Sequence, residues 1–438
     1  MISKIESLVA IGLPILLYLM VFTDNIIFFY LSVMIGLLFI TKPIVILPWY
    51  FVSSLSTSYF SLSNGMSAGR FTFVVILVSL FIQVIKNQRK FTSPYILIVT
   101  ILLIYSFLSA ITSVTGSIEP FVLMMMNILF FLLLQYDDSI DMNKFYRYLS
   151  IVFFICLISI AFFILQHGHD LLLQRFHDEN DAMNSNRLAM MCNQTGTFLF
   201  AVFLLSKGFI AKVFSILGFI AAILEIIILG TRSALIALIL ASIIGLYLYQ
   251  KANSNVSKKT VRLIFVSLIF IGGFIIYYLS MIDSPLMERF SAEVIVESKG
   301  TNRLNLIEII MTKIFPDYPL FGVGIGSENI YEAGKPFGLE RPGHNIIIDP
   351  LSQLGIVGFS LFLFLIIPLF VKSLKATLDS KIKYLITPAF LLFLTSVING
   401  VGEIVFYERF FWNDMALCAY CLVLYRRSKV WGCIKHWH

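Results

Sequence analysis

The sequence predicts an all-α, polytopic integral membrane protein, and composition together with the apolar pattern leads to that class. Hydrophobic residues make up 59% of the 438 residues and charged residues 13%, against about 45–50% and about 25% in soluble domains. With a mean hydropathy of +0.91, the chain has more apolar surface than a soluble core can hide, so lipid is its main solvent. The apolar segments lack the period-2 alternation of a membrane β-barrel, which leaves helices as the spanning elements.

Apolar segments of helix length recur along the chain, and we predict about fourteen transmembrane helices. The first segment has no small-residue cleavage site, so it is predicted to be a retained helix and not a removed signal peptide. Pro43 and Pro48 interrupt the early part of the pattern. The predicted spans are 7–23, 26–40, 43–57, 71–85, 94–112, 118–135, 147–166, 188–206, 209–229, 232–250, 261–281, 346–373, 381–399 and 411–425.

The distribution of Lys and Arg predicts the orientation of these spans. If the amino terminus is cytoplasmic and successive loops alternate between the two sides of the membrane, about two thirds of the 32 Lys and Arg residues fall in short loops on one side. The positive-inside rule assigns that side, with both termini, to the cytoplasm. The net charge of +7 then reflects membrane orientation and gives no reason to expect nucleic-acid binding.

Two long loops fall on the outward side, at 167–187 and 283–345. Loops of this length between helices are usually functional or disordered. The second is predicted to fold, because it contains a helical pattern over 303–314, two proline stops and the glycine-rich sequence FGVGIGS at 321–327. The predicted organisation is transmembrane helices, the large periplasmic loop with short helices, further transmembrane helices and a cytoplasmic tail, at 1–282, 283–345, 346–425 and 426–438.

Arg232 is the first candidate for chemistry, because it lies between two apolar segments in LGTRSALIALIL, just after Gly230. An arginine at this depth is costly unless it is paired or faces a polar cavity. Ser233 is a candidate cap for the following helix, whose amino-terminal amides would favour an anion at the same place. Arginine and a helix amino terminus together predict an anion site. The alternative is an arginine that flanks or snorkels to the membrane surface.

Arg303 and His344 are the next candidates. Arg303 begins the amphipathic helix of the large loop in TNRLNLIEII, and a solvated helix face is the alternative. His344 stands where that loop returns to the membrane, and a histidine in such a place can take a proton from a hydroxyl group. Asn345 and Asp349 are near enough in sequence to orient its ring. A capping or loop histidine is the alternative for His344.

Other polar groups are weaker candidates. The histidines and acidic residues of 167–187 match no standard zinc spacing, so we predict a solvated loop and no metal site. Glu225 lies within a predicted span, where a carboxyl group either marks function or is a hydrogen-bonded structural residue. Glu403, Glu408 and Arg409 lie along the last outward loop and are expected to contribute to the same cavity.

Motifs that are absent narrow the function further. The sequence has no Walker A motif, no Rossmann fingerprint and no Asp-x-Asp for a nucleotide-sugar metal. The candidate residues lie outside the cytoplasm, where ATP and nucleotide sugars are not supplied. An enzyme there needs a substrate that is activated inside and carried out on a lipid, and a sugar on a polyprenyl diphosphate meets that requirement.

Four stretches taken together resemble the O-antigen ligase/O-antigen polymerase family of bacterial membrane glycosyltransferases. Their order and spacing over residues 185–373 carry the resemblance, whereas residues 1–150 match only as generic membrane helices. Members of the family often have about twelve spans, so twelve is the alternative to fourteen. The stretches are SNRLAM (185–190), LGTRSALIAL with Arg232, the set MERF (287–290), TNRLNLIEII and YPLFGVGIGS (318–327), and HNIIIDPLSQLGIVG with His344.

The resemblance implies roles for particular residues. Arg232 and Arg303 would bind the diphosphate of an undecaprenyl-linked donor, and His344 would act at the acceptor hydroxyl as a base or a positioning group. It also implies a GT-C-like fold that uses no metal or other cofactor. The implied partners are an undecaprenyl-diphosphate-linked oligosaccharide, membrane lipids and a chain-length regulator protein. The further residues expected to bind the substrate or its diphosphate are Arg187, Arg289, Asn345, Glu403 and Arg409.

These observations lead to the hypothesis of an O-antigen polymerase, or a related surface-polysaccharide polymerase, that joins lipid-linked repeat units at the periplasmic face of a bacterial inner membrane. The alternative within the family is the ligase, which transfers finished polysaccharide to lipid A–core. A transporter of lipid-linked oligosaccharide is the alternative from another class. Transporters place charges near the bilayer midplane, whereas most charges outside the cytoplasm fall here in outward loops.

Overall fold

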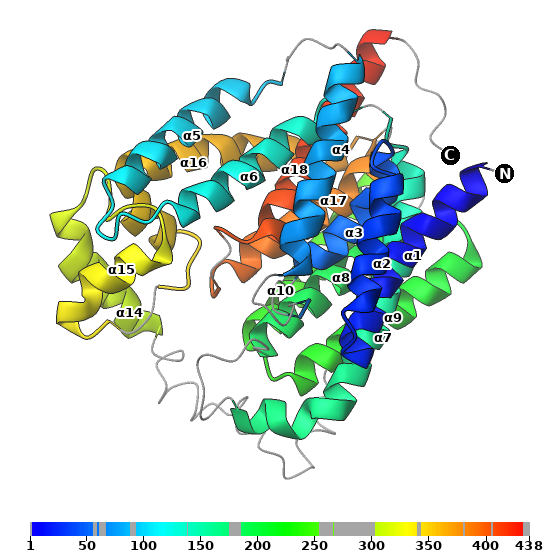
Figure 1. Ribbon diagram of the computed structural model, residues 1–438, viewed down its shortest axis with the longest axis horizontal. Helices are drawn as coiled ribbons and strands as arrows, with labels where there is room; N and C mark the ends of the chain where they lie inside the picture. The colour runs from blue at the N-terminus through cyan, green and yellow to red at the C-terminus, as the bar shows by residue number, and fades with distance from the viewer. Residues whose placement is uncertain are drawn as a thin grey trace.

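The computed structural model describes most of the chain, and within that part every regular element is a helix (Figure 1). Side chains are described for the same residues except 2–3, 87, 167–174 and 428–431. The described residues are 2–55, 59–60, 67–87, 93–137, 139–174, 185–253, 266, 303–339, 343–379, 382–403 and 406–431.

The helices fall into a long membrane set and a short set near the middle of the chain. The long set comprises α1 (Ile2–Thr23), α2 (Ile27–Leu38), α3 (Pro43–Leu55), α4 (Ala68–Asn87), α5 (Ile96–Ile111), α6 (Glu119–Leu134), α7 (Met142–Gln174), α8 (Ser185–Leu205), α9 (Phe209–Ile228), α10 (Arg232–Ala252), α16 (Ile348–Thr377), α17 (Lys383–Asn399) and α18 (Arg409–Trp431). The short set comprises α14 (Arg303–Ile309), η1 (Ile310–Ile314), η2 (Phe315–Asp317), α15 (Ser327–Gly334) and η3 (Lys335–Phe337).

The predicted spans coincide with these long helices, except that the span at 261–281 lies almost wholly outside the described residues. By length and composition, seven described helices can cross a membrane, namely α1, α4, α7, α8, α9, α10 and α16. Five more apolar helices have 10–17 residues, so they are short for a perpendicular crossing. The polytopic membrane bundle is thereby confirmed as the fold class.

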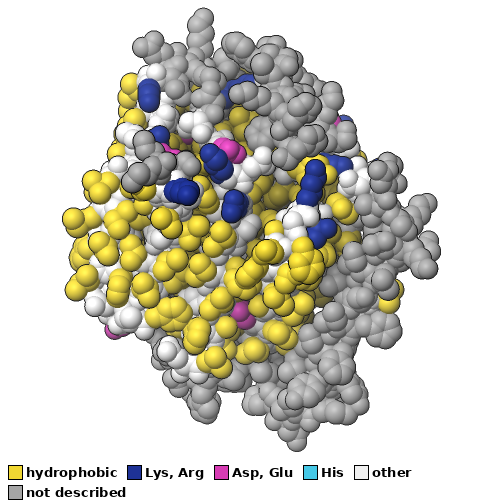
Figure 2. All heavy atoms as spheres, turned by 90° about the vertical axis from the view of Figure 1, so that its right-hand side faces the viewer, with side chains coloured by type: hydrophobic (Ala, Val, Ile, Leu, Met, Phe, Trp, Pro, Cys, Tyr) yellow, Lys and Arg dark blue, Asp and Glu magenta, His cyan; other side chains and the backbone are white. Residues whose placement is uncertain are grey.

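The bundle divides into a main body and a lateral group. In Figure 1, α5, α6 and α16 lie to one side of the main body, and α14 and α15 lie beside one end of that group. Figure 2 shows hydrophobic side chains over the middle of one face, with Lys and Arg side chains gathered above them. On α2, Met34 is 67% exposed and Leu38 80% exposed. Because such residues would be costly in water, this surface is the one that lipid covers.

A buried polar network joins α8 to α17 and α18 inside the bundle. Asn193 Nδ2 donates to Asn399 Oδ1 at 3.1 Å, and Gln194 Nε2 donates to the Ser396 hydroxyl at 2.6 Å. That hydroxyl in turn donates to Asp414 at 2.6 Å. Polar groups in an apolar interior must be satisfied internally. The network therefore fixes the middle of α8 against the carboxyl-terminal end of α17. Residues of the site below lie at the start of α8 and just after the end of α17.

The glycine-rich segment predicted at 321–327 packs against a break in α16. At Gly355 the helix has φ of 62°. Four backbone hydrogen bonds between residues 319–324 and α16 compensate for the break, including Val323 N–H to Ser352 O at 2.9 Å. A Cβ on Gly322 would lie 2.3 Å from the backbone of Gln353, and one on Gly355 would lie 2.3 Å from that of Leu320. Only glycine permits so close an approach of two backbones. The segment is thus a structural joint that places α15 and the start of α16.

The short helices of the central segment have a core of their own. The helix predicted over 303–314 is confirmed as α14 and η1, and it ends in η2, which contains Pro316. This unit packs on the joint and on the start of α16, so its fold also positions the site. The buried core residues are Ile310, Ile314, Val323, Ile330 and Leu339.

Candidate functional site

His344 lies just before α16 on a strained and firmly held piece of backbone. Its φ of 49° lies in the left-handed region, which is uncommon for a residue with a side chain. Asn345 holds the following backbone, because its Oδ1 accepts the N–H groups of Ile347 and Ile348 at 2.9 and 3.2 Å. Its Nδ2 donates to Val401 O at 2.9 Å. Asn345 therefore caps α16 and ties it to the loop after α17.

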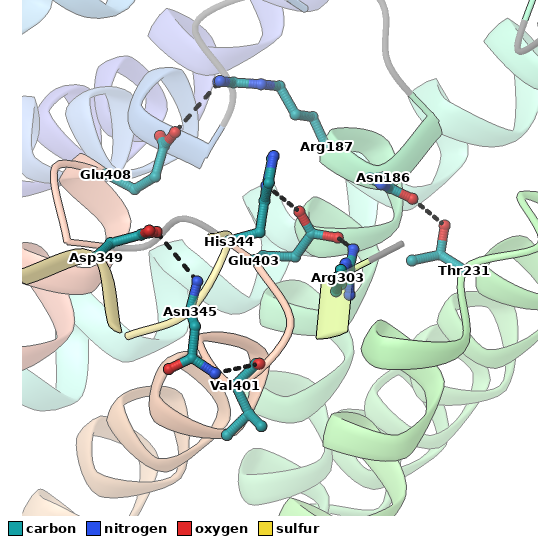
Figure 3. Close-up of polar contacts among 10 residues, drawn as sticks. All are labelled: Asn186, Arg187, Thr231, Arg303, His344, Asn345, Asp349, Val401, Glu403 and Glu408. Atoms are coloured by element: carbon teal, nitrogen blue, oxygen red, sulfur yellow. Dashed lines mark hydrogen bonds and ion pairs between the residues drawn. The ribbon is translucent and has the colours of Figure 1, made fainter. Parts of the chain in front are cut away.

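Glu403, in that loop, links two of the predicted residues. Its Oε1 accepts a hydrogen bond from Arg303 Nη2 at 2.9 Å, and its Oε2 lies 3.9 Å from His344 Nδ1. The carboxylate is shared by a guanidinium group from α14 and an imidazole from the start of α16 (Figure 3). Glu403 is only 8% exposed, so water screens these interactions little.

Arg232 lies at the first position of α10, next to the same group. Gly230, with φ of 65°, makes the turn, and the hydroxyl of Thr231 donates to Asn186 Oδ1 at 3.1 Å. The prediction that Ser233 caps the helix is wrong, because α10 already begins at Arg232 and Thr231 is the N-cap residue. Among the described residues, the Arg232 side chain has no ion-pair partner, which leaves its charge available to an anion.

Gly402 is the meeting point of α10 and α14. A Cβ on Gly402 would lie 2.7 Å from Arg303 Nη1 and 3.4 Å from the Cβ of Ser233. The absence of a side chain at 402 lets the Arg303 guanidinium pass close to the first turn of α10. The structure therefore brings Arg303, Glu403 and His344 together and sets the start of α10 beside them.

A cavity of about 320 Å³ opens beside this group. Its wall is formed by the end of α3, the start of α6, the start of α8, the start of α15 and the segments that carry His344 and Glu403. One part of the wall is apolar and the rest is polar, as is usual for ligand pockets. The lining residues are Leu55, Glu119, Pro120, Leu123, Asn186, Arg187, Met190, Gly326, Ser327, Glu328, His344, Glu403, Tyr407, Glu408 and Phe410.

Arg187, one of the residues expected to bind the substrate, lines the cavity and pairs there with Glu408. Its Nη2 lies 3.4 Å from Glu408 Oε1, and Figure 3 shows the two side chains reaching toward each other past His344. Both side chains are partly exposed, so this pair contributes little to stability by itself. The charges of Arg187 and Glu408 nevertheless face any molecule that binds in the cavity.

Arg409 does not line the cavity, although its neighbours Glu408 and Phe410 do. It is 6% exposed, and its guanidinium lies over the ring of Phe73 at 5.3 Å and against Gly69 of α4. A cation held over an aromatic ring and away from solvent serves packing. The structure thus separates Arg409 from the predicted site.

The remaining candidates are placed outside the cavity or cannot be placed. Arg289 lies outside the described residues, and so do the side chains of 167–184. Glu225 is buried and accepts a hydrogen bond from Cys192 Sγ at 3.1 Å, and it does not line the cavity. No group of three or more metal-ligating side chains occurs within the described ranges.

Sequence reasoning did not find Glu328 and Tyr407. Tyr407 accepts a hydrogen bond from the N–H of Gly326 at 2.8 Å, and burial raises the pKa of its phenol well above the usual value, so the hydroxyl keeps its proton. Glu328 lies in the first turn of α15. Neither residue belongs to a recognisable motif. Glu328 follows the glycine-rich segment, Tyr407 lies in the loop before α18, and the packing of these two segments brings both residues to the cavity.

The chemistry of the wall follows from its charges. It offers an imidazole near a carboxylate, the guanidinium group of Arg187 and further carboxylates, and the guanidinium group of Arg303 is bound to Glu403 beside it. Such a set can move a proton to or from a hydroxyl group and can stabilise negative charge on a leaving group.

Comparison with protein-family models gives a match. Residues 217–363 match the protein-family model described as "O-Antigen ligase". The matched segment contains Arg232, Arg303 and His344, whereas Arg187 and Glu403 fall outside it. A search of curated proteins found no match. The match is to a family of glycosyltransferase-like enzymes, and it gives no support to a transporter.

Proposed function

We propose that this protein is a polymerase of O-antigen or a related surface polysaccharide. Its residues 217–363 match the O-antigen ligase family model, so it belongs to the O-antigen ligase/O-antigen polymerase family. It joins oligosaccharide repeat units carried on undecaprenyl diphosphate. The reaction takes place at the periplasmic face of the inner membrane, and both termini are cytoplasmic. Membrane lipids surround the chain, and a chain-length regulator is a further partner.

The observation that carries this proposal is the position of Glu403 between Arg303 and His344 on the cavity wall. These three residues come from three separate segments, and the start of α10 with Arg232 adjoins them. A site for glycosyl transfer from a diphosphate needs a proton acceptor for the acceptor hydroxyl and fixed cations for the leaving group. His344 and Glu403 line the cavity, and Arg303 is bound to Glu403 beside that part of its wall.

In the proposed reaction, an acceptor hydroxyl oxygen bonds to the anomeric carbon of the donor sugar while the bond from that carbon to the diphosphate oxygen breaks. His344 takes the hydroxyl proton, and Glu403 stabilises the imidazolium ion that forms. The diphosphate leaves with the electron pair. Arg232 and Arg303 stabilise its growing charge most in the transition state. If the displacement is a single step, the anomeric configuration inverts.

Orientation supports a periplasmic site. The short loops with most of the Lys and Arg residues belong to the cytoplasm by the positive-inside rule. In that topology, α8 and α10 begin, and α9 and α17 end, on the opposite side. Asn186, Thr231 and Glu403 lie at those ends, so the cavity faces the compartment that contains lipid-linked repeat units and no nucleotide sugars.

Chain extension by purified protein tests the proposal. In lipid nanodiscs with lipid-linked repeat units, wild-type protein should form longer chains, whereas His344→Ala and Arg232→Ala should each lose extension at least a hundredfold. Lys313→Ala, which changes an exposed cation on η1, serves as the matched control and should extend normally. Extension by both site variants at the wild-type rate would contradict the proposal.

The ligase is the second candidate, because the matched family model bears the ligase description. The two activities differ in their acceptor. Repeat units given alone should be extended by a polymerase, whereas a ligase transfers only after lipid A–core is added. Product that appears only with the core lipid would replace the polymerase assignment by the ligase.

A further inference from the structure

Four carboxylates line the cavity, and the described structure pairs three of them with cations. Glu119 lies 3.6 Å from Arg70, Glu408 lies 3.4 Å from Arg187, and Glu403 accepts a hydrogen bond from Arg303 at 2.9 Å. The guanidinium groups of Arg70, Arg187 and Arg303 therefore each already face a carboxylate of this wall. Arg232, which has no ion-pair partner among the described residues, is not one of the residues that line the cavity.

Glu328 is the fourth carboxylate, and it has no ion-pair partner among the described residues. It is exposed and lies in the first turn of α15. Its negative charge offsets the positive end of that helix, so the start of α15 is not suited to an anion. Glu328 therefore gives this part of the cavity a negative side chain that no Lys, Arg or His of the described residues pairs with.

The backbone that carries Glu328 is held at several points. The N–H of Gly326 donates both to Gln353 Oε1 and to Tyr407 Oη, at 2.8 Å each. Asn329 Oδ1 accepts the N–H of Thr115 at 2.9 Å. Because these bonds tie α15 to α16, to the loop before α18 and to the loop after α5, the position of the Glu328 backbone does not depend on a bound ligand.

The cavity also offers apolar contacts, from Pro120, Leu123 and Phe410 among others. A sugar ring has an apolar face of C–H groups and a rim of hydroxyl donors. Apolar side chains suit the face, and carboxylates are strong acceptors for hydroxyl groups. At about 320 Å³, the cavity is at the small end of ligand pockets, so it suits the end of an oligosaccharide and not a whole carrier lipid.

We propose, on the basis of the proposed function, that Glu328 binds hydroxyl groups of the acceptor sugar and restricts this cavity to uncharged or amino sugars. A sugar carboxylate would meet the free charge of Glu328. To pair with Arg187 or Arg303, it would have to displace Glu408 or Glu403. Either exchange leaves a protein carboxylate without its cation, so an acidic sugar gains nothing from entering.

Two acceptors that differ at one carbon test the inference. They are lipid-linked oligosaccharides that end in a hexose or in the matching hexuronate, so a CH₂OH group is replaced by a carboxylate. Wild-type protein should extend the hexose acceptor with a kcat/KM at least about tenfold higher, which is the effect of one like charge at a partly exposed site. Glu328→Gln should reduce that ratio to about threefold or less by improving the use of the hexuronate.

Glu332→Gln is the matched control, because it removes a carboxylate one turn further along α15 that pairs with Lys335 at 3.8 Å and does not line the cavity. It should keep the wild-type ratio. Equal use of both acceptors by wild-type protein, or an unchanged ratio in Glu328→Gln, would overturn the inference while the polymerase assignment stands.

Binding of the two free oligosaccharides, measured by calorimetry, separates failure of the inference from failure of the proposed function. If wild-type protein extends neither acceptor but binds the hexose form more tightly, and Glu328→Gln removes that preference, the sugar selectivity stands and the polymerase function falls. If the protein shows no binding preference and no extension, both the sugar selectivity and the polymerase function are contradicted.

Discussion

Glu403→Gln tests the proposed chemistry most directly, because it removes one charge while it keeps nearly the same volume. Glu403 Oε2 lies 3.9 Å from His344 Nδ1, and the side chain of Glu403 is 10% exposed. Two unit charges about 4 Å apart interact by about 4 kcal/mol at an effective dielectric constant of about 20. In the proposed reaction His344 becomes positively charged only as it takes the proton, so most of this stabilisation is lost from the transition state. At about 1.4 kcal/mol for each factor of ten, kcat should fall roughly 10²–10³-fold.

Steady-state chain extension in nanodiscs measures this effect. The KM for the acceptor should change much less than kcat, because in the proposed reaction the imidazole takes up its proton in the chemical step and not on binding. Glu408→Gln is the matched control, since Glu408 also lines the cavity but pairs with Arg187 at 3.4 Å, and its kcat should fall less than about tenfold. A wild-type kcat in Glu403→Gln, or an equal loss in both variants with unchanged thermal unfolding, would refute the reasoning.

Three further changes test the parts that hold the site. Gly322→Ala should lower the free energy of unfolding by about 3 kcal/mol or more, because its Cβ would lie 2.3 Å from the backbone of Gln353. Gly338 has a similar φ and open space around it, so Gly338→Ala should lower that free energy by only about 1 kcal/mol. Thermal unfolding in detergent compares the two variants, and equal losses would contradict the proposed joint. Asn345→Ala should cost about 1–2 kcal/mol in the same measurement and lower kcat, and an unchanged midpoint would show that its cap is dispensable. Gly402→Ala should leave unfolding nearly unchanged but raise the KM for the lipid-linked donor roughly tenfold by displacing the Arg303 guanidinium; an unaltered KM would count against a role for that guanidinium in donor binding.

The helices could be predicted from the sequence because lipid leaves the backbone few choices. Every N–H and C=O within the membrane must be bonded internally, so a long apolar segment is a helix. α14 and η1 could also be predicted, because an amphipathic pattern indicates a helix and a following proline ends it. Neither signal depends on tertiary contacts. The break of α16 at Gly355 could not be predicted in this way, because its compensating hydrogen bonds come from a segment about thirty residues away.

Residues of the candidate site could be predicted where a charged or titratable side chain has a high free-energy cost at its position. Arg232, Arg303 and His344 were singled out because charged or titratable groups near a membrane need a reason to be there, and the structure brings the starts of their segments together. The same reasoning could not tell which of two adjacent charged residues lines the cavity. Glu408 and Arg409 are adjacent in the sequence, yet one lines the cavity and the other packs on Phe73.

By itself, the sequence determined the solvent of this protein, the helical nature of its segments and the residues whose charge demands a partner. These depend on composition and local pattern, which act within a few residues. Only the tertiary structure decided which partner each charge has. Glu403 meets Arg303 across 100 residues of chain, and Glu328 reaches the cavity because glycines at 322 and 355 let two backbones touch. Such contacts depend on how helices pack against one another, and packing is a property of the whole bundle.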